Sequence, residues 1–131
     1  MSLLGATEIR ELAAKLDLNP SKGLGQNFVI DGNVCQRIVR QVSIAPSDVA
    51  LEIGPGLGSL TLAILETGAP LIAVEIDSRL AKQLPETVKS HNPNADLTVV
   101  NQDALNVTQL PKDPTVLVAN LPYNVSVPVL L

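Results

Sequence analysis

The chain of 131 residues is long enough to bury one hydrophobic core and too short for two domains of ordinary size. The single Cys35 excludes a disulfide framework and a cysteine metal cluster, which fits a reducing, cytoplasmic compartment. No apolar run reaches the ~18 residues that a membrane span requires, and the net charge of −4 by itself argues against a nucleic-acid partner.

Two helices and a loop are predicted before the first strand. Apolar residues recur at helical spacing over residues 7–16, with Thr7 as the expected N-cap. A second helix is predicted over residues 33–42 by the same spacing. The intervening residues 19–33 are rich in turn formers, which predicts an ordered loop.

From residue 49 onward the pattern alternates between strands and helices. The predicted strands are Val49 to Ile53, Leu71 to Val74, Leu97 to Val100 and Thr115 to Ala119. The predicted helices are Ser59 to Thr67, which Gly68 ends, and Ser78 to Lys89, which Pro85 is expected to interrupt or re-aim. Near-continuous apolar strands between amphipathic helices indicate an α/β fold, a parallel sheet with helices on both faces.

The last residues, SVPVLL, predict the beginning of an apolar helix, with Ser126 as its cap and Pro128 in its first turn. Such a helix would stop at Leu131 with its apolar face uncovered. We therefore interpret the chain as a fragment of a longer protein.

The first predicted strand runs into the glycine-rich sequence E-I-G-P-G-L-G at residues 52–58. A dinucleotide fingerprint, G-x-G-x-x-G, would need its third glycine at position 59, which is a serine. Closely spaced glycines still bring the backbone near a ligand, but Pro55 removes an amide donor that a pyrophosphate would use. This pattern disfavours an NAD-dependent oxidoreductase.

Acidic residues follow the second and third predicted strands. Glu75 ends V-E, 21 residues after Gly54, where a carboxylate can accept hydrogen bonds from both ribose hydroxyls of NAD or of S-adenosylmethionine. Asp103 is placed to take an adenine amino group. The alternatives are a solvated strand-end carboxylate for Glu75 and a helix cap for Asp103.

The sequence Asn120-Leu121-Pro122-Tyr123 follows the fourth predicted strand. The amine of adenine is a poor nucleophile, because its lone pair is delocalised into the ring. An Asn120 side-chain oxygen and the Leu121 carbonyl would hold that amine with two acceptors, and Tyr123 would stack on a base turned out of its helix. A rigid strand-to-turn connection is the structural alternative.

Taken together in this order, E-I-G-P-G-L-G, V-E-I-D, Q-D-A and N-L-P-Y-N-V-S resemble the class I S-adenosylmethionine-dependent adenine methyltransferases. The loop K-G-L-G-Q-N-F at residues 22–28 narrows the resemblance to the ribosomal RNA adenine N6,N6-dimethyltransferases. The resemblance spans roughly residues 20 to 131. It implies an incomplete Rossmann-like sheet of about four strands, in the order 3-2-1-4.

The resemblance also implies a domain organisation and residue roles. Residues 1–45 would hold the N-terminal helices and a cofactor loop, and residues 46–131 the N-terminal half of the cofactor-binding domain. The residues that would bind S-adenosylmethionine are Asn27, Val29, Gly54, Gly56, Glu75, Ile76, Asp103 and Asn120. The residues that would act on the target adenine are Asn120, Leu121 and Tyr123. No metal is implied, and His91 is expected to be a solvated loop residue.

The family implies dimethylation of two adjacent adenosines in the 3′-terminal hairpin of 16S small-subunit rRNA, within an assembling ribosomal subunit. A large-subunit rRNA methyltransferase that confers antibiotic resistance is the nearest alternative, and a non-catalytic nucleic-acid-binding factor is another. Intact Glu75, Asp103 and Asn120 argue against a factor that needs no cofactor. The acidic composition opposes RNA binding, so a basic surface is expected in the missing part of the protein.

In the order 3-2-1-4, the strand from Thr115 to Ala119 would lack its usual neighbour. An unpaired apolar edge invites pairing with another chain. We therefore expect the fragment to be inactive alone and to self-associate, and the full-length protein to be a monomer.

Overall fold

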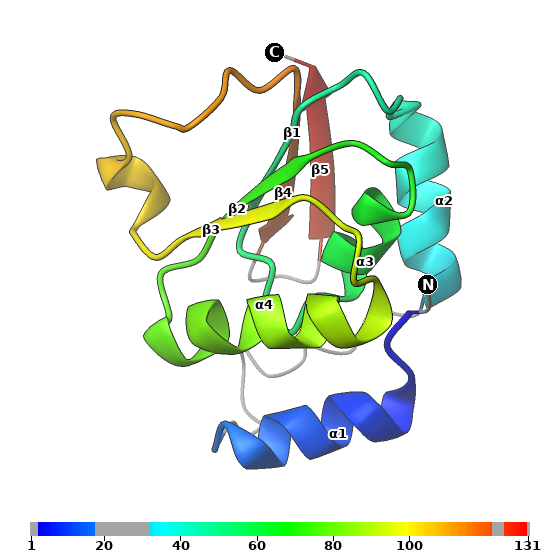
Figure 1. The fold of residues 1–131 in the computed structure, drawn as a ribbon, viewed down its shortest axis with the longest axis vertical. Coiled ribbons are helices and arrows are strands. Elements are labelled where there is room, and N and C mark those ends of the chain that lie inside the picture. Colours follow the sequence, from blue (N-terminus) through cyan, green and yellow to red (C-terminus); the bar gives the residue numbers. More distant parts are fainter. Residues whose placement is uncertain (1–2, 18–31, 122–124, 131) are drawn as a thin grey trace.

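The computed structural model describes residues 3–17, 32–121 and 125–130. The elements in chain order are α1 (Ala6–Lys15), α2 (Gly32–Val42), β1 (Ala50–Ile53), α3 (Ser59–Leu65), β2 (Leu71–Val74), α4 (Ser78–His91), β3 (Leu97–Val100), the 3-10 turn η2 (Ala104–Asn106), β4 (Val116–Leu121) and β5 (Val125–Leu130) (Figure 1). Strand and helix alternate from β1 to β3, which places short apolar strands side by side with a helix after each of the first two.

The strands form one sheet in the order β3-β2-β1-β4-β5. Strands β3, β2, β1 and β4 are parallel, and their register places Leu51 of β1 beside Ile72 of β2 and Leu117 of β4. The predicted parallel order 3-2-1-4 is confirmed. Because parallel strands end at a common edge, the residues that follow β1, β2 and β3 are brought together there.

The predicted helix beginning at Ser126 is wrong. Residues 125–130 form β5, which runs antiparallel to β4 and pairs Val118 with Pro128. Valine at positions 125, 127 and 129 favours a strand, and an edge strand tolerates the proline, which cannot donate to a ladder. The expectation that β4 would be an unpaired edge strand is therefore also wrong, because β5 pairs with it.

The two faces of the sheet are covered differently. On one face, side chains from all four helices join the main core, for example Ile9, Val39, Leu60 and Leu84. On the other face, a smaller cluster of Leu51, Ile72 and Val74 is packed against apolar residues of the β3–β4 connection.

The sequence predicted helices on both faces of the sheet, but the second face is covered by the β3–β4 connection instead. In the described residues, the β3–β4 connection forms only the turn η2, and Pro111 and Pro114 disfavour a long helix there. All four described helices therefore contribute to one face.

Two helix details also differ from the prediction. Helix α1 begins at Ala6 with Gly5 as its N-cap, so Thr7 lies inside the helix. Helix α4 continues through Pro85 to His91, because its capped start at Asp77 and its buried apolar face stabilise it. Of the helices described in the structure, none combines the length and apolarity needed to cross a membrane.

The expectation of a solvated loop position for His91 is wrong. His91 is the last residue of α4, and its side chain is only 12% exposed. Its Nε2 atom lies 2.8 Å from both carboxylate oxygens of Glu8 on α1. This contact, with a hydrogen bond of 2.9 Å from Lys15 Nζ to Gln83 Oε1, fixes α1 beside α4 (Figure 1).

Candidate functional site

The glycine turn after β1 can be built only from residues that accept left-handed backbone angles. Gly54, Gly56 and Gly58 have φ angles of 71°, 60° and 104°. At Gly58 a Cβ atom would lie 2.8 Å from Leu84 Cδ1, so any other residue there would also have to displace the buried Leu84 side chain. The turn therefore places backbone at the carboxyl end of β1, directly before the first residue of α3.

Glu75, the residue after β2, is bound to this turn. Its Oε1 accepts a hydrogen bond of 3.1 Å from the Gly56 amide, and its Oε2 accepts one of 3.1 Å from the Asp77 amide. Burial raises the pKa of Glu75, and these backbone hydrogen bonds oppose the rise. A carboxylate oxygen has two lone pairs, so each oxygen keeps one acceptor position for a neighbouring hydroxyl.

Asn101, the residue after β3, holds the segment that contains Glu75 and Ile76. Its Nδ2 donates to the Glu75 carbonyl at 2.9 Å and to the Ile76 carbonyl at 3.4 Å. Its Oδ1 accepts a hydrogen bond of 3.2 Å from the Ser78 hydroxyl. Sequence reasoning considered only Asp103 after this strand. The position of Asn101 could have identified it as a site residue, because it directly follows β3 just as Glu75 directly follows β2.

A cavity of about 150 Å³ lies among these strand ends. Four of the predicted site residues line it: Gly54, Glu75, Ile76 and Asp103. The remaining lining residues are Ile53, Val74, Gln102 and Ala104. The structure thus brings together the residues that follow three separate strands, as the sequence predicted.

The side chains of the cavity differ in what they offer a ligand. Ile76 is 65% exposed and presents an apolar surface. Asp103 accepts a hydrogen bond of 3.0 Å from the Leu105 amide with Oδ1, so it does cap η2 while its other oxygen remains an acceptor. The lining residues that the structure describes include two carboxylates and no lysine or arginine, so their field favours a cation over a phosphate.

The other predicted residues are placed only in part. Asn120 and Leu121 lie in β4, and the pairing of Ile53 with Ala119 puts the Asn120 backbone at the same edge as Gly54. Asn27, Val29 and Tyr123 lie outside the described residues. Their roles, and those of the Asn120 and Leu121 side chains, stay predictions.

Glu52 lies within β1 on the opposite face from the cavity, in contact with α3. It is fully buried, and its Oε1 accepts a hydrogen bond of 2.6 Å from the Thr61 hydroxyl. Within the described part of the chain, its Oε2 and the buried Ser59 hydroxyl have no hydrogen-bond partner. Burial raises the pKa of Glu52 to about 8; the Thr61 hydrogen bond opposes this, and the charge of Glu75 adds to it. Glu52 is therefore neutral at pH 7, beneath the glycine turn.

Comparison with known proteins agrees with this geometry. The model of the family described as "Ribosomal RNA adenine dimethylase" matches residues 18–131. The chain is 59% identical over 133 residues to "Ribosomal RNA small subunit methyltransferase A" of Leifsonia xyli subsp. xyli. This match covers 100% of the present chain and 48% of that protein. The chain spans about half the length of the curated relatives that it matches.

Two solved structures share the fold at recognisable sequence identity. The dimethyladenosine transferase from Plasmodium falciparum is 29% identical, with a TM-score of 0.60 over 70% of this chain and 32% of that one. The 23S rRNA methyltransferase ErmE is 27% identical, with a TM-score of 0.55 over 72% of this chain and 48% of that one.

Proposed function

We propose, because the chain belongs to the ribosomal RNA adenine dimethylase family, that the cavity at the ends of β1, β2 and β3 binds S-adenosylmethionine for methyl transfer to adenine. The observation that carries the proposal is the convergence of Gly54, Glu75, Ile76 and Asp103 on one cavity. These residues come from three separate motifs of the sequence, yet the fold gathers them.

The geometry supports a specific distribution of roles. The two free acceptor positions of the Glu75 carboxylate suit the adjacent hydroxyls of a ribose. The exposed Ile76 side chain suits the face of the adenine ring, and Asp103 suits its amino group. Gly54 and Gly56 leave room for the methionine part, and the carboxylates favour a positively charged sulfonium. Asn27 and Val29 would complete the site from the loop before α2.

Transfer would take place where the β4 edge meets the glycine turn. The Asn120 side-chain oxygen and the Leu121 carbonyl would hold the adenine amine so that its nitrogen lone pair faces the methyl group. Tyr123 would stack on the target base. The amine nitrogen would gain the methyl group as the bond from that methyl to the sulfonium sulfur breaks, which leaves a neutral thioether, and the nitrogen would lose a proton. Two rounds, each with a fresh cofactor molecule, would give the dimethylated base. The contribution of the protein is positioning and exclusion of water, with no covalent intermediate.

For the whole protein we propose small-subunit rRNA as the substrate. Two adjacent adenosines in the 3′-terminal hairpin of 16S rRNA in an assembling cytoplasmic subunit would be the targets. The 59% identity to a small-subunit methyltransferase, against 27% to a 23S rRNA methyltransferase, supports this choice over the large subunit. The division into residues 1–45 and 46–131, the monomeric state of the full-length protein and the inactivity of this chain alone belong to the same proposal.

The test of the cofactor is calorimetric titration with S-adenosylmethionine, with NAD as the comparison ligand. Glu75→Ala should weaken binding at least roughly tenfold, because the ribose loses both acceptors. Glu11→Ala, which removes an exposed carboxylate from α1, is the matched control and should bind like the unchanged chain. Binding of NAD in preference to S-adenosylmethionine would overturn the proposal.

The substrate is tested separately with the full-length protein. Radiolabelled S-adenosylmethionine should label unmethylated small subunits and leave large subunits unlabelled. Labelling of large subunits alone would favour the alternative that the ErmE likeness represents.

A further inference from the structure

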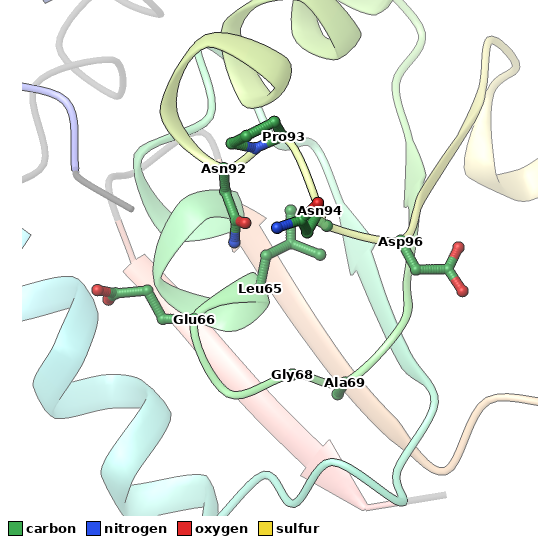
Figure 2. A pocket seen from close by; sticks show the side chains of 9 residues that line it. Leu65, Glu66, Gly68, Ala69, Asn92, Pro93, Asn94 and Asp96 are labelled. Carbon is green, nitrogen blue, oxygen red and sulfur yellow. The ribbon is translucent and has the colours of Figure 1, made fainter.

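A larger cavity lies at the other end of the sheet, remote from the candidate cofactor site. Its volume is about 460 Å³, and it lies between the C-terminal ends of α3 and α4, where the chain turns into β2 and β3 (Figure 2). Leu65 and Ala69 are buried and supply apolar surface. None of the family motifs in the sequence includes these residues, so the cofactor site does not account for the cavity.

Asn92 is the unusual residue of this cavity. It is the C-cap of α4 and is only 9% exposed. Its backbone is satisfied, since its amide donates to the Val88 carbonyl at 2.7 Å and its carbonyl accepts from the Ala95 amide at 3.1 Å. Among the described residues, however, its side-chain amide forms no hydrogen bond. Figure 2 shows this amide directed into the space beside Leu65.

Nearly all buried amides in native structures are hydrogen-bonded to protein, to ordered water or to a ligand, because an unsatisfied one is costly. The polar atoms of the Asn92 side chain are not fully enclosed by protein, so a molecule in the cavity can reach them. A ligand in the cavity would supply the missing hydrogen bond. This observation points to an occupant independently of the size of the cavity.

The charges around the cavity select the kind of occupant. Glu66 and Asp96 lie on its two sides with their carboxylates directed outward, and its described lining residues include no lysine or arginine (Figure 2). The partial negative charge at the C-terminus of α4 adds to theirs. Among the described residues, the partner of the Glu66 carboxylate is the neutral amide of Gln36, at 3.3 Å. The Lys112 ammonium, 3.5 Å from Asp96, belongs to an exposed ion pair, which is weak.

We propose that this cavity binds an alkylammonium or alkylguanidinium group, a cationic head on a short apolar stem. The Asn92 side-chain oxygen accepts a hydrogen bond from the head, the flanking carboxylates supply the field, and Leu65 and Ala69 contact the stem. A volume of about 460 Å³ lies in the range of small-molecule sites, roughly 300–1,000 Å³. The head can be a free amine or guanidine, or a lysine or arginine side chain of a partner protein.

The experiment is a nitrogen-edited NMR titration of the chain with n-butylguanidinium, and n-butylurea is the neutral probe of nearly the same shape. The Asn92 side-chain resonances and the Ala69 amide should shift and saturate with n-butylguanidinium. The neutral urea should bind at least roughly tenfold more weakly, because it lacks the charge. Equal binding of the two probes, or no shift at Asn92 with either, would overturn the proposal.

Two substitutions at one position test the sign of the interaction. Asn92→Asp keeps the shape and adds a negative charge, so it should tighten n-butylguanidinium binding several-fold. Asn92→Leu removes the acceptor and should weaken binding roughly tenfold. Asn106→Leu, an exposed position in η2, is the control and should bind like the unchanged chain. If Asn92→Leu does not fold, the test rests on Asn92→Asp. Weaker binding of n-butylguanidinium to Asn92→Asp than to the unchanged chain would contradict the proposal.

A capped peptide with one central arginine separates the two sources of the cation. Tighter binding of the peptide than of n-butylguanidinium assigns the cavity to a protein partner, and the reverse order assigns it to a free small molecule. Binding of neither excludes both. The Asn92 variants should titrate with S-adenosylmethionine like the unchanged chain, so failure here is distinct from failure of the proposed function.

Discussion

Glu52 couples the stability of the chain to pH. In the folded chain the pKa of Glu52 is raised to about 8 from an ordinary value of 4.5, so the native state binds a proton that the unfolded chain releases. The stabilisation from that proton is complete below about pH 4.5 and is lost as the pH rises through about 8. Over this interval, the contribution of Glu52 to the free energy of unfolding should fall by several kcal/mol, on the order of 5.

Urea denaturation between pH 5 and pH 9 measures this contribution by comparison with Glu52→Gln. The glutamine is neutral at every pH, so the stability of the variant relative to the unchanged chain should rise steadily from pH 5 to pH 8. Because Glu75 also has a raised pKa and Asp77 a lowered one, only the difference between the two chains isolates Glu52. Glu11→Gln, at an exposed position, should follow the unchanged chain. Parallel curves for Glu52→Gln and the unchanged chain would contradict the prediction.

Gly58 offers a matched pair of glycine substitutions. Gly58→Ala forces a side chain into a φ of 104° and places its Cβ atom 2.8 Å from Leu84 Cδ1, so we expect a loss of about 1–3 kcal/mol. Gly5→Ala meets nothing within 4 Å and has a φ of −91°, so its effect should stay below about 1 kcal/mol. Urea denaturation of both variants tests the difference. Equal losses would mean that the turn relaxes at no cost.

At the residue scale, the sequence located strand-end residues and missed their supports. Gly54, Glu75 and Asp103 were predictable because a fixed spacing and a strand end identify each of them. Asn101 and Glu52 act through contacts with segments distant in sequence, and no local pattern reports such contacts. The missing partner of Asn92 is visible only once α3 and α4 are packed together.

At the element scale, the contact between Glu8 and His91 governs how α1 is held. It joins residues 83 positions apart and is the closest polar contact described between α1 and α4. His91→Ala should release part of α1, because the other described contacts with α4 are apolar side chains and exposed polar contacts: those of Lys15 with Gln83 and Glu86, and that of Arg79 with the Leu16 carbonyl. We expect amide hydrogen exchange in α1 to accelerate several-fold, as for a loss of about 1 kcal/mol, with exchange in β1 unchanged.

Lys89→Ala is the control for this measurement, since Lys89 is exposed in the same last turn of α4. It should leave exchange in α1 unchanged. Faster exchange in β1 as well as α1 would show that His91 supports the whole core and not the attachment of one helix.

Element types followed the sequence wherever a local rule and the packing agreed. All four predicted parallel strands lie within two residues of their expected bounds, because apolar strands between helices have one way to be buried. Residues 125–130 were misjudged, because Ser126 and Pro128 match a helix start locally. The pairing that makes them β5 depends on β4, and strand pairing is a non-local property.

At the scale of the whole molecule, β5 determines which edges of the sheet are open. Since β5 pairs along β4 from Val116 to Leu121, the described edges are β3 and β5. Strand β4 therefore pairs with β1 on one side and with β5 on the other, so its backbone hydrogen-bonding groups are satisfied within the chain. The self-association that we expected from an open β4 should therefore be weak in the present chain and strong once β5 is removed.

Deletion of residues 125–131 would expose the hydrogen-bonding edge of β4 and should convert the chain to dimers or larger species at concentrations where the unchanged chain is a monomer. Sedimentation velocity at several concentrations measures this directly. The same deletion with Leu117→Lys adds a charge on the exposed strand, which natural edge strands use to block pairing, and should reduce the association. If the deleted chain stays monomeric at every concentration, β5 does not protect β4. The partly buried apolar side chains of the second sheet face would then be the surface to examine, since they are covered only by the β3–β4 connection in the described residues.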